Sequence, residues 1–368
     1  MNATRRRACL DQMTPYVPGK PIEAVKRELG IKDVIKMASN ENPLGPSPRV
    51  LEAVREFLPL INFYPDADCH SLKEDLAKHF ALESKNIIVG NGADELIFFV
   101  GTTYLDPGDE MIVACPSFSE YESAAQQMNA LPVRVPCRDF DYDLEAMAAA
   151  VNKKTKLIVI CNPNNPTGKI VTHGELEAFL KKLPADVLVI IDEAYKEYVT
   201  DSSYPRSLEF LKNGHNVLIL RTFSKGYGLA GLRVGYGLAP AAVIADLNIV
   251  RPPFNVNSVA QVAARAALGD QEHLQAVQAL NNRGKEFLSR EFERLGLFYL
   301  PTETNFFFVE VGVDSRQLFK KLLQKGVIVR SGSAYGFPYF IRVSIATEEQ
   351  NTRFIEALEG SLEELRTI

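Results

Sequence analysis

Between about residues 86 and 240, the chain alternates short apolar runs with longer amphipathic segments. We expect strands at the runs NIIVG, EMIVAC, KLIVIC, VLVIID, NVLILR and VGYGLA. Segments of helical length lie between them, at ADELIFFVGTTYL, SEYESAAQQMNA, DLEAMAAAVN and THGELEAFLKKL. Strands that are apolar throughout are buried on both faces, and their alternation with helices predicts an α/β fold with a mostly parallel sheet flanked by helices.

The pattern changes beyond residue 240. Residues 240–300 are expected to be largely helical, and after them the apolar runs NFFFVEV, GVIVR and YFIRVSI alternate with helices near 314–325 and from Thr347 onward. This order predicts a second, smaller α+β domain. The predicted division is an N-terminal arm with part of the small domain at 1–45, a large domain at 46–265 and a small C-terminal domain at 266–368.

Composition excludes several classes of function. A hydrophobic content of 46% and a charged content of 24% are ordinary for a soluble globular protein. The net charge of −5 gives no reason to expect nucleic acid or an acidic membrane surface as a partner. No run approaches the ~18 apolar residues of a membrane span. No apolar segment follows the basic run at 5–7, so a secretory signal is not expected either.

The cysteine and histidine patterns argue against metal and disulfide chemistry. The five cysteines are widely spaced without a CxxC pair, and the five histidines are scattered. Neither a metal site nor a disulfide framework is therefore expected, and the cytoplasm is the expected compartment.

Polar residues follow several of the predicted strands, at the edge where parallel sheets bind their ligands. Asp192 ends the run VLVIID, where an ionised carboxylate is costly without a partner. A protonated ring nitrogen would be such a partner, because a pair at ~4 Å and an effective dielectric of ~20 gains roughly 4 kcal/mol. Helix capping or a salt bridge would explain a lone aspartate equally well. Tyr195, three residues later, could reach a neighbouring phenolate oxygen.

Two further loops are compatible with cofactor binding. In CNPNNPTG, the prolines and glycine are explained by a turn, whereas Asn165 could donate to a cofactor oxygen. GNGADE follows NIIV and opens a helix, where backbone amides and the helix dipole favour a phosphate. A dinucleotide fingerprint would need glycine at Glu95, so that interpretation is weak. Asp94 and Glu95 are also compatible with first-turn acids that complement the dipole.

The stretch RTFSKGYGLAGLRVGY carries the most specific chemistry. Thr222, Ser224 and Arg233 offer hydroxyl and guanidinium groups suited to a phosphate dianion. A nearby cation and partial burial would lower the pKa of Lys225 and leave a free amine able to form a Schiff base. A surface lysine in a glycine loop is the alternative. Four strand ends that each offer a complementary part of one cofactor site favour the catalytic interpretation.

NPNNPTG, IIDEAY and TFSKGYGLAGLRVGY, in this order and spacing, resemble the signatures of fold type I, pyridoxal-phosphate-dependent aminotransferases. The resemblance covers nearly the whole chain. The arm PYVPGKPIEAVKRELG and the segments ASNENPLGPSP, YPD and GNGADE are similar to the histidinol-phosphate aminotransferase branch. The implied cofactor is pyridoxal 5'-phosphate.

The resemblance also implies roles for individual residues. Lys225 would form the Schiff base and move the proton between Cα and C4′. Asp192 would pair with the pyridine nitrogen, and Tyr195 and Asn165 would form hydrogen bonds with the ring oxygen. Phe118 of PSFSEY would stack on the ring. The phosphate would be held by Thr222, Ser224, Arg233, the backbone amides of Ala93 and Asp94, and Tyr64 of a neighbouring subunit. The last of these implies a homodimer with shared active sites.

For substrates, the resemblance points to anion recognition. Arg330 and Arg342 match positions that bind an anionic substrate group, and a bidentate arginine suits both a carboxylate and a phosphate. A strand cation paired to an acid is the alternative for Arg342, and an edge cation for Arg330. Tyr16 and Asn42 are further candidates for the substrate pocket.

The implied reaction is a two-stage transamination in histidine biosynthesis, with glutamate and 2-oxoglutarate as one pair and histidinol phosphate and imidazole-acetol phosphate as the other. An aromatic amino-acid aminotransferase would keep every cofactor residue, and a threonine-phosphate-type decarboxylase shares the fold. A non-catalytic binding module is disfavoured by the intact Lys225, Asp192 and Arg233.

Overall fold

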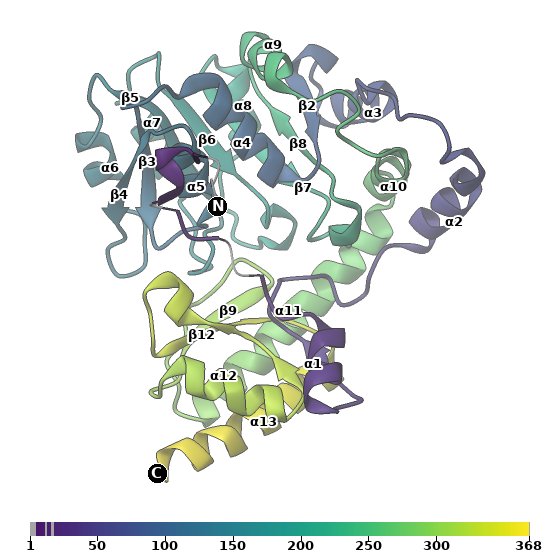
Figure 1. Ribbon diagram of the computed structural model, residues 1–368, viewed down its shortest axis with the longest axis vertical. Helices are drawn as coiled ribbons and strands as arrows, with labels where there is room; N and C mark the ends of the chain where they lie inside the picture. The colour runs from purple at the N-terminus through teal and green to yellow at the C-terminus, as the bar shows by residue number, and fades with distance from the viewer. Residues whose placement is uncertain (1–4, 12, 16–17, 368) are drawn as a thin grey trace.

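The computed structural model describes residues 5–11, 13–15 and 18–367. Figure 1 shows two units, with the large sheet in the upper one and short strands in the lower one. Helix α11 (Gln271–Arg294) runs from the upper unit into the lower one. Within the described ranges, no helix has the length and apolar character needed to cross a membrane.

The large sheet confirms the predicted α/β architecture. Its strands lie in the order β2-β8-β7-β6-β5-β3-β4. All pair in parallel except β8, which runs antiparallel to both of its neighbours. The strands are β2 (Ile87–Gly90), β3 (Glu110–Cys115), β4 (Leu131–Pro136), β5 (Thr155–Cys161), β6 (Leu188–Asp192), β7 (Val217–Thr222) and β8 (Gly235–Leu238).

Strand β4 was not expected from the apolar pattern. It is the outermost strand beside β3, and it contains Pro132 and Pro136. Proline is tolerated on an edge strand, because one side of such a strand has no partner to receive its amides. The exposed Leu131 and Arg134 break the apolar run by which the buried strands were recognised.

Helices cover both faces of the large sheet, as predicted. The expected helices form as α4 (Ala93–Tyr104), α5 (Glu120–Gln127), α6 (Leu144–Ala149) and α7 (His173–Leu180), and α8 (Ser207–Lys212) and α9 (Ala241–Val250) complete the layers. Successive residues of β6 point to opposite faces, so Val189 and Ile191 belong to one core and Ile190 to the other. Burial on both faces explains why these strands are apolar throughout.

Three further helices pack together at one side of the large unit: α2 (Pro48–Phe57), α3 (His70–Phe80) and α10 (Ser258–Leu268). Ser47 caps α2 by accepting a hydrogen bond from Val50 N. The neighbouring 3-10 helix η2 (Leu58–Leu60) is exposed.

Among the described residues, the small unit contains two short sheets and three helices of its own, besides the end of α11. β11 (Arg330–Ser331), β12 (Phe340–Ser344) and β9 (Phe306–Glu310) pair antiparallel, and β1 (Ile35–Lys36) pairs in parallel with β10 (Val327–Ile328). The helices are α1 (Ile22–Leu29), α12 (Ser315–Gln324) and α13 (Glu348–Arg366). A capping box at Thr347 begins α13 where the sequence predicted it. β1 therefore joins the N-terminal region to the small unit, and the boundaries at 46 and 266 stay a prediction.

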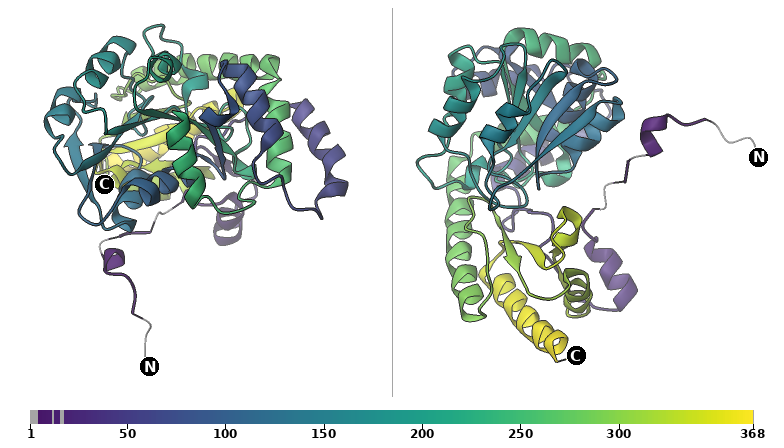
Figure 2. Two further views of the ribbon diagram at one scale, coloured as in Figure 1. Left: turned by 90° about the horizontal axis from the view of Figure 1, so that it is seen from above. Right: turned by 90° about the vertical axis from the view of Figure 1, so that its left-hand side faces the viewer.

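The described part of the N-terminal region includes a 3-10 helix, η1 (Ala8–Asp11). Cys9 Sγ lies 3.9 Å from the Gln127 carbonyl oxygen of α5. Figure 2 shows η1 projecting outward from the body of the molecule.

Candidate active site

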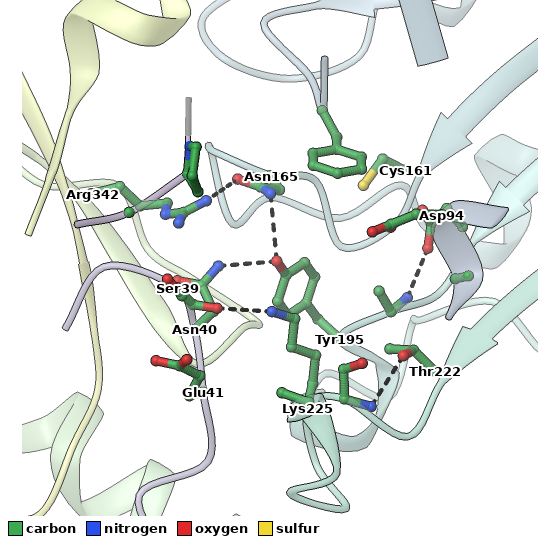
Figure 3. Close-up of a pocket in the computed structure, with 18 of the residues that line it drawn as sticks. Ser39, Asn40, Glu41, Asp94, Cys161, Asn165, Tyr195, Thr222, Lys225 and Arg342 are labelled. Atoms are coloured by element: carbon green, nitrogen blue, oxygen red, sulfur yellow. Dashed lines mark hydrogen bonds between the residues drawn. The ribbon is translucent and has the colours of Figure 1, made fainter. Parts of the chain in front are cut away.

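A cavity of about 340 Å³ lies where the carboxyl ends of the large sheet face the small unit. Both units contribute to its wall, as Figure 3 shows. The residues predicted from the sequence that line it are Ala93, Asp94, Phe118, Asn165, Asp192, Tyr195, Thr222, Ser224, Lys225, Arg233 and Arg342. The structure thus brings together most of the predicted cofactor set, although their roles stay predictions.

Asp192 is the last residue of β6 and is 5% exposed. Its Oδ2 accepts a hydrogen bond from the Tyr121 hydroxyl at 2.6 Å, and its Oδ1 accepts one from Ala194 N at 3.0 Å. Burial raises the pKa of Asp192 to about 6, although these two hydrogen bonds act to lower it. Within the described part of the chain, Asp192 makes no ion pair, so a cation in the cavity would be a fitting partner.

Lys225 lies in the loop that follows β7. Its Nζ donates to the Ser39 carbonyl oxygen at 2.8 Å and lies 5.8 Å from the centre of the Tyr195 ring. Burial and the nearby Arg342 lower the pKa of Lys225 to about 8. The loop needs Gly228, which has φ +73°, and a Cβ there would lie 2.4 Å from the Gly45 carbonyl oxygen.

A cationic, hydroxyl-rich cradle forms at the N-terminus of α4. Arg233 Nη1 donates to Ser224 Oγ at 3.3 Å, and its Nη2 donates to Asp94 Oδ2 at 3.2 Å. Gly92, with φ +87°, precedes Ala93, and a Cβ on it would lie 2.6 Å from Arg233 Nη2. Backbone amides, the helix dipole and a guanidinium group therefore converge on one place, which suits a phosphate.

A connected set of side-chain amides surrounds Tyr195, between the sheet and the small unit. The Tyr195 hydroxyl accepts from Asn40 Nδ2 at 3.0 Å and from Asn165 Nδ2 at 3.4 Å, and Asn165 Oδ1 accepts from Arg342 at 2.7 Å (Figure 3). Burial raises the pKa of Tyr195, so its phenol keeps its proton at neutral pH. Since two amides already donate to its oxygen, that proton is available to an acceptor such as a ring oxygen.

Arg342, on β12, is the cation of the small-unit wall. Its Nη1 also donates to the Tyr335 hydroxyl at 2.9 Å, and its Nη2 donates to the Ala38 carbonyl oxygen at 2.6 Å. Arg330 lies directly opposite Arg342 in the β11–β12 pair, so both side chains leave the sheet on the same face. Arg330 is nevertheless not among the residues that line the cavity, and its role in substrate binding stays a prediction.

Two other predicted residues lie elsewhere. Asn42 is buried with its Nδ2 donating to the Gly226 carbonyl oxygen at 2.9 Å, and it does not line the cavity. Tyr64 is 83% exposed and stacks on Phe254, with 4.8 Å between ring centres. Tyr16 lies outside the described residues. Their proposed roles in substrate and cofactor binding stay predictions.

Sequence reasoning missed several groups in the site, among them Ser39, Asn40 and Tyr121. Asn40, not Asn42, is the asparagine of ASNENP that reaches the cavity. It has φ 56°, a left-handed conformation in which asparagine is enriched, but a single asparagine in the sequence does not reveal it. Tyr121 stands in the same segment as Phe118 and gave no separate signal.

These features fit a flat, phosphate-bearing cofactor with a ring nitrogen that can be protonated. Phe118 is available for stacking, Asp192 for the ring nitrogen, Tyr195 for a ring oxygen, and the Arg233 cradle for the phosphate. The lowered pKa of Lys225 places a reactive amine in the same cavity.

Comparison with known proteins agrees with this chemistry. The sequence profile of aminotransferases of class I and II matches residues 32–358. The chain is 56% identical to the histidinol-phosphate aminotransferase of Moorella thermoacetica, over 97% of this chain and 92% of the relative. It is 48% identical to histidinol-phosphate aminotransferase 2 of Carboxydothermus hydrogenoformans, over 97% of this chain and 99% of the relative.

A solved structure extends the likeness to the fold. The histidinol-phosphate aminotransferase of Sinorhizobium meliloti, in complex with pyridoxal-5'-phosphate, superimposes with a TM-score of 0.91 at 31% identity. The match covers 99% of each chain.

Proposed function

The chain belongs to the aminotransferase class I and II family, and we propose that it transfers the amino group between the glutamate/2-oxoglutarate pair and the histidinol phosphate/imidazole-acetol phosphate pair. Its cofactor is pyridoxal 5'-phosphate, and the reaction belongs to histidine biosynthesis. The observation that carries the proposal is a half-buried lysine and a buried aspartate, each with a displaced pKa, in one cavity with a phosphate cradle.

When bound, the cofactor supplies an electron sink for the carbanion formed at the substrate Cα. Asp192 would hold the positive charge of the ring nitrogen, and Tyr195 would donate to the ring oxygen. With a pKa of about 8, the Lys225 amine is partly neutral at physiological pH, so Nζ would be able to take the proton from the substrate Cα and deliver it to C4′ of the cofactor. The hydrogen bond to the Ser39 carbonyl oxygen directs Nζ within the cavity.

On the small-unit wall, we assign the substrate anion to Arg342. Tyr335, Asn165 and the Ala38 carbonyl hold its guanidinium in one orientation, which leaves little side-chain entropy to lose on binding. The cavity volume of about 340 Å³ lies within the ~300–1,000 Å³ of ordinary small-molecule sites. Arg330, Asn42 and Tyr16 remain further candidates for the substrate pocket.

A homodimer with shared active sites is part of the proposal. Large apolar side chains are exposed along α2, η2 and the following loop, and contiguous apolar surface of this kind marks association sites. They are Leu51, Leu58, Leu60, Ile61, Phe63 and Tyr64. In a dimer Tyr64 would reach the phosphate cradle of the partner.

All five cysteines are free, and the cytoplasm is the compartment that we propose.

The experiment is a comparison of amino donors with 2-oxoglutarate as acceptor. Histidinol phosphate should give stoichiometric glutamate with a kcat/KM well above that of phenylalanine or tyrosine. A higher kcat/KM for the aromatic donors would move the assignment to an aromatic aminotransferase. Carbon dioxide released from phosphothreonine, without consumption of 2-oxoglutarate, would move it to a decarboxylase.

A further inference from the structure

A buried ion pair lies directly behind the cavity and takes no part in lining it. Glu193 follows Asp192, and Arg221 precedes Thr222. Arg221 Nη2 lies 2.6 Å from Glu193 Oε2, and Arg221 Nε donates to the same oxygen at 2.8 Å. The exposed fractions of the two side chains are 8% and 0%.

The Glu193–Arg221 pair links β6 and β7 at the point where the backbone hydrogen bonds between these strands end. The last residues in register are Asp192 and Leu220, and the last backbone bond runs from Glu193 N to the Leu220 carbonyl oxygen at 2.9 Å. Beyond this point, β6 and β7 continue into the loops that carry Ala194 and Lys225. The Glu193–Arg221 pair is the side-chain link at the start of both loops.

The second oxygen of Glu193 reaches other segments. Oε1 accepts from Ser207 Oγ of α8 at 2.7 Å and lies 3.3 Å from the Tyr204 hydroxyl. The same hydroxyl is 2.5 Å from the carbonyl oxygen of Asn162, the first residue after β5. One carboxylate therefore connects the ends of β5, β6 and β7.

Arg221 is equally enclosed on its other side. Its guanidinium lies over the Phe80 ring, 5.1 Å from the ring centre. Glu197 is close enough for its charge to act on Arg221, and a Cβ on Gly226 would lie 2.8 Å from Glu197 Cβ. The backbone next to Lys225 thus rests on Glu197, in the same buried group of side chains.

Stability alone does not account for this arrangement. Burying an ion pair removes two charges from water, and apolar residues of similar volume often do as well or better. What apolar residues lack is direction, because a hydrogen bond and a second close N–O contact to one carboxylate oxygen fix how the two segments lie relative to each other.

We propose that Glu193 and Arg221 are positioning residues that hold Asp192 and the Thr222–Lys225 segment at the separation that the cofactor requires. The inference depends on the cofactor-binding roles given above to Asp192 and Lys225. The pair acts through those residues and touches neither cofactor nor substrate.

The test is the double variant Glu193→Leu/Arg221→Met, which removes both charges together and leaves none unpaired. Its matched control is Arg294→Met/Glu359→Leu, which makes the same changes at a two-bond pair of the small unit, with both N–O distances 2.9 Å. The readouts are thermal unfolding of the cofactor-free proteins, the Kd for pyridoxal phosphate, the spectroscopic pH titration of the lysine-bound cofactor, and kcat and KM for histidinol phosphate.

The Glu193/Arg221 variant should fold and bind the cofactor at least ~10-fold more weakly, with a shifted titration midpoint and a kcat reduced by ~10–100-fold at a nearly unchanged KM. The control should match the wild type in all cofactor readouts. A cofactor Kd and titration midpoint equal to those of the wild type would overturn the inference.

If the double variant does not fold, Arg221→Lys decides, because it keeps the charge and removes the contact of two guanidinium nitrogens with one oxygen. A cofactor Kd higher than that of Arg294→Lys supports the positioning role, and an equal cofactor Kd overturns it. Failure of the proposed function is distinguishable, since the wild type itself would then not bind pyridoxal phosphate or would not transaminate.

Discussion

The two walls of the cavity are built on different principles. On the sheet wall, Asp192 is buried and Lys225 is half-buried, and both have displaced pKa values. Asp192 makes no ion pair with the rest of the described chain. On the small-unit wall, Arg342 and Asn40 are held in dense hydrogen-bond networks. Under the proposed function, a charged cofactor would complete the sheet wall, whereas the small-unit wall is already held by hydrogen bonds within the chain.

The origin of the two walls in the chain explains the difference. Neighbouring parallel strands deliver Asn165, Asp192 and Thr222 to one edge, so a single sheet places the cofactor groups. The small-unit wall joins residues distant in sequence. The backbone N–H of Asn40, for example, donates to Ser344 Oγ, 304 positions away. We therefore expect changes on the sheet wall to alter cofactor binding and chemistry, and changes on the other wall to alter substrate binding.

Lys225→Ala should have the largest effect, because it removes both the covalent link and the base. Turnover should fall by more than ~10⁴-fold, while the protein folds and binds the cofactor without the covalent link. Borohydride reduction followed by peptide mapping checks the link. Lys36→Ala, at another lysine that lines the cavity, should keep the covalent link; normal turnover in Lys225→Ala would remove Lys225 from its role.

Arg342→Gln should lower kcat/KM by ~10²–10³-fold, because an anionic substrate would lose its charged partner. The loss should appear in KM for both histidinol phosphate and glutamate. The cofactor Kd should change little, since Arg342 belongs to the small-unit wall. Arg330→Gln is the matched comparison: an effect as large would place Arg330 in the substrate site, and no effect would leave Arg342 as the anion-binding arginine.

Tyr64→Phe should weaken cofactor retention by ~10-fold if the hydroxyl donates to the phosphate of the partner. The measurement is the Kd for pyridoxal phosphate in the variant and in mixed dimers with Lys225→Ala. In such a dimer, the site that keeps Lys225 receives an intact Tyr64 from the partner and should regain normal retention. Mixed dimers that retain the defect would argue against shared sites.

Tyr121→Phe should have the smallest effect, about 5-fold in the cofactor Kd, because one hydrogen bond to the Asp192 carboxylate is lost. In the cofactor-free protein Asp192 has a pKa of about 6, and a positive ring nitrogen needs it ionised. Cofactor affinity should therefore fall as the pH drops through 6. Without the Tyr121 hydroxyl the pKa of Asp192 should rise, so the fall should begin at a higher pH; an unshifted profile would contradict this.

The sequence revealed the sheet wall more completely than the small-unit wall. Buried strands are apolar throughout, so their ends, and with them Asp192 and Thr222, could be located from the pattern. The missed β4 is an exposed edge strand with prolines, which lacks that signal. The pairing of Lys225 with Ser39 spans 186 positions, and no local pattern encodes such a contact.

The residues that the sequence misplaced or overlooked have the same explanation. Asn42 was chosen from its segment, but the local backbone turns Asn40 into the cavity and Asn42 toward Gly226. Glu193 and Arg221 stood inside recognised motifs, yet only the folded structure shows that they face each other behind the site.

The most direct test of the central claim is the visible spectrum of the purified holoenzyme during stepwise addition of histidinol phosphate alone. The account predicts a saturable loss of the band of the lysine-bound cofactor and a matching growth of the band of the aminated cofactor. An unchanged spectrum with histidinol phosphate, together with the same conversion by phenylalanine, would contradict it.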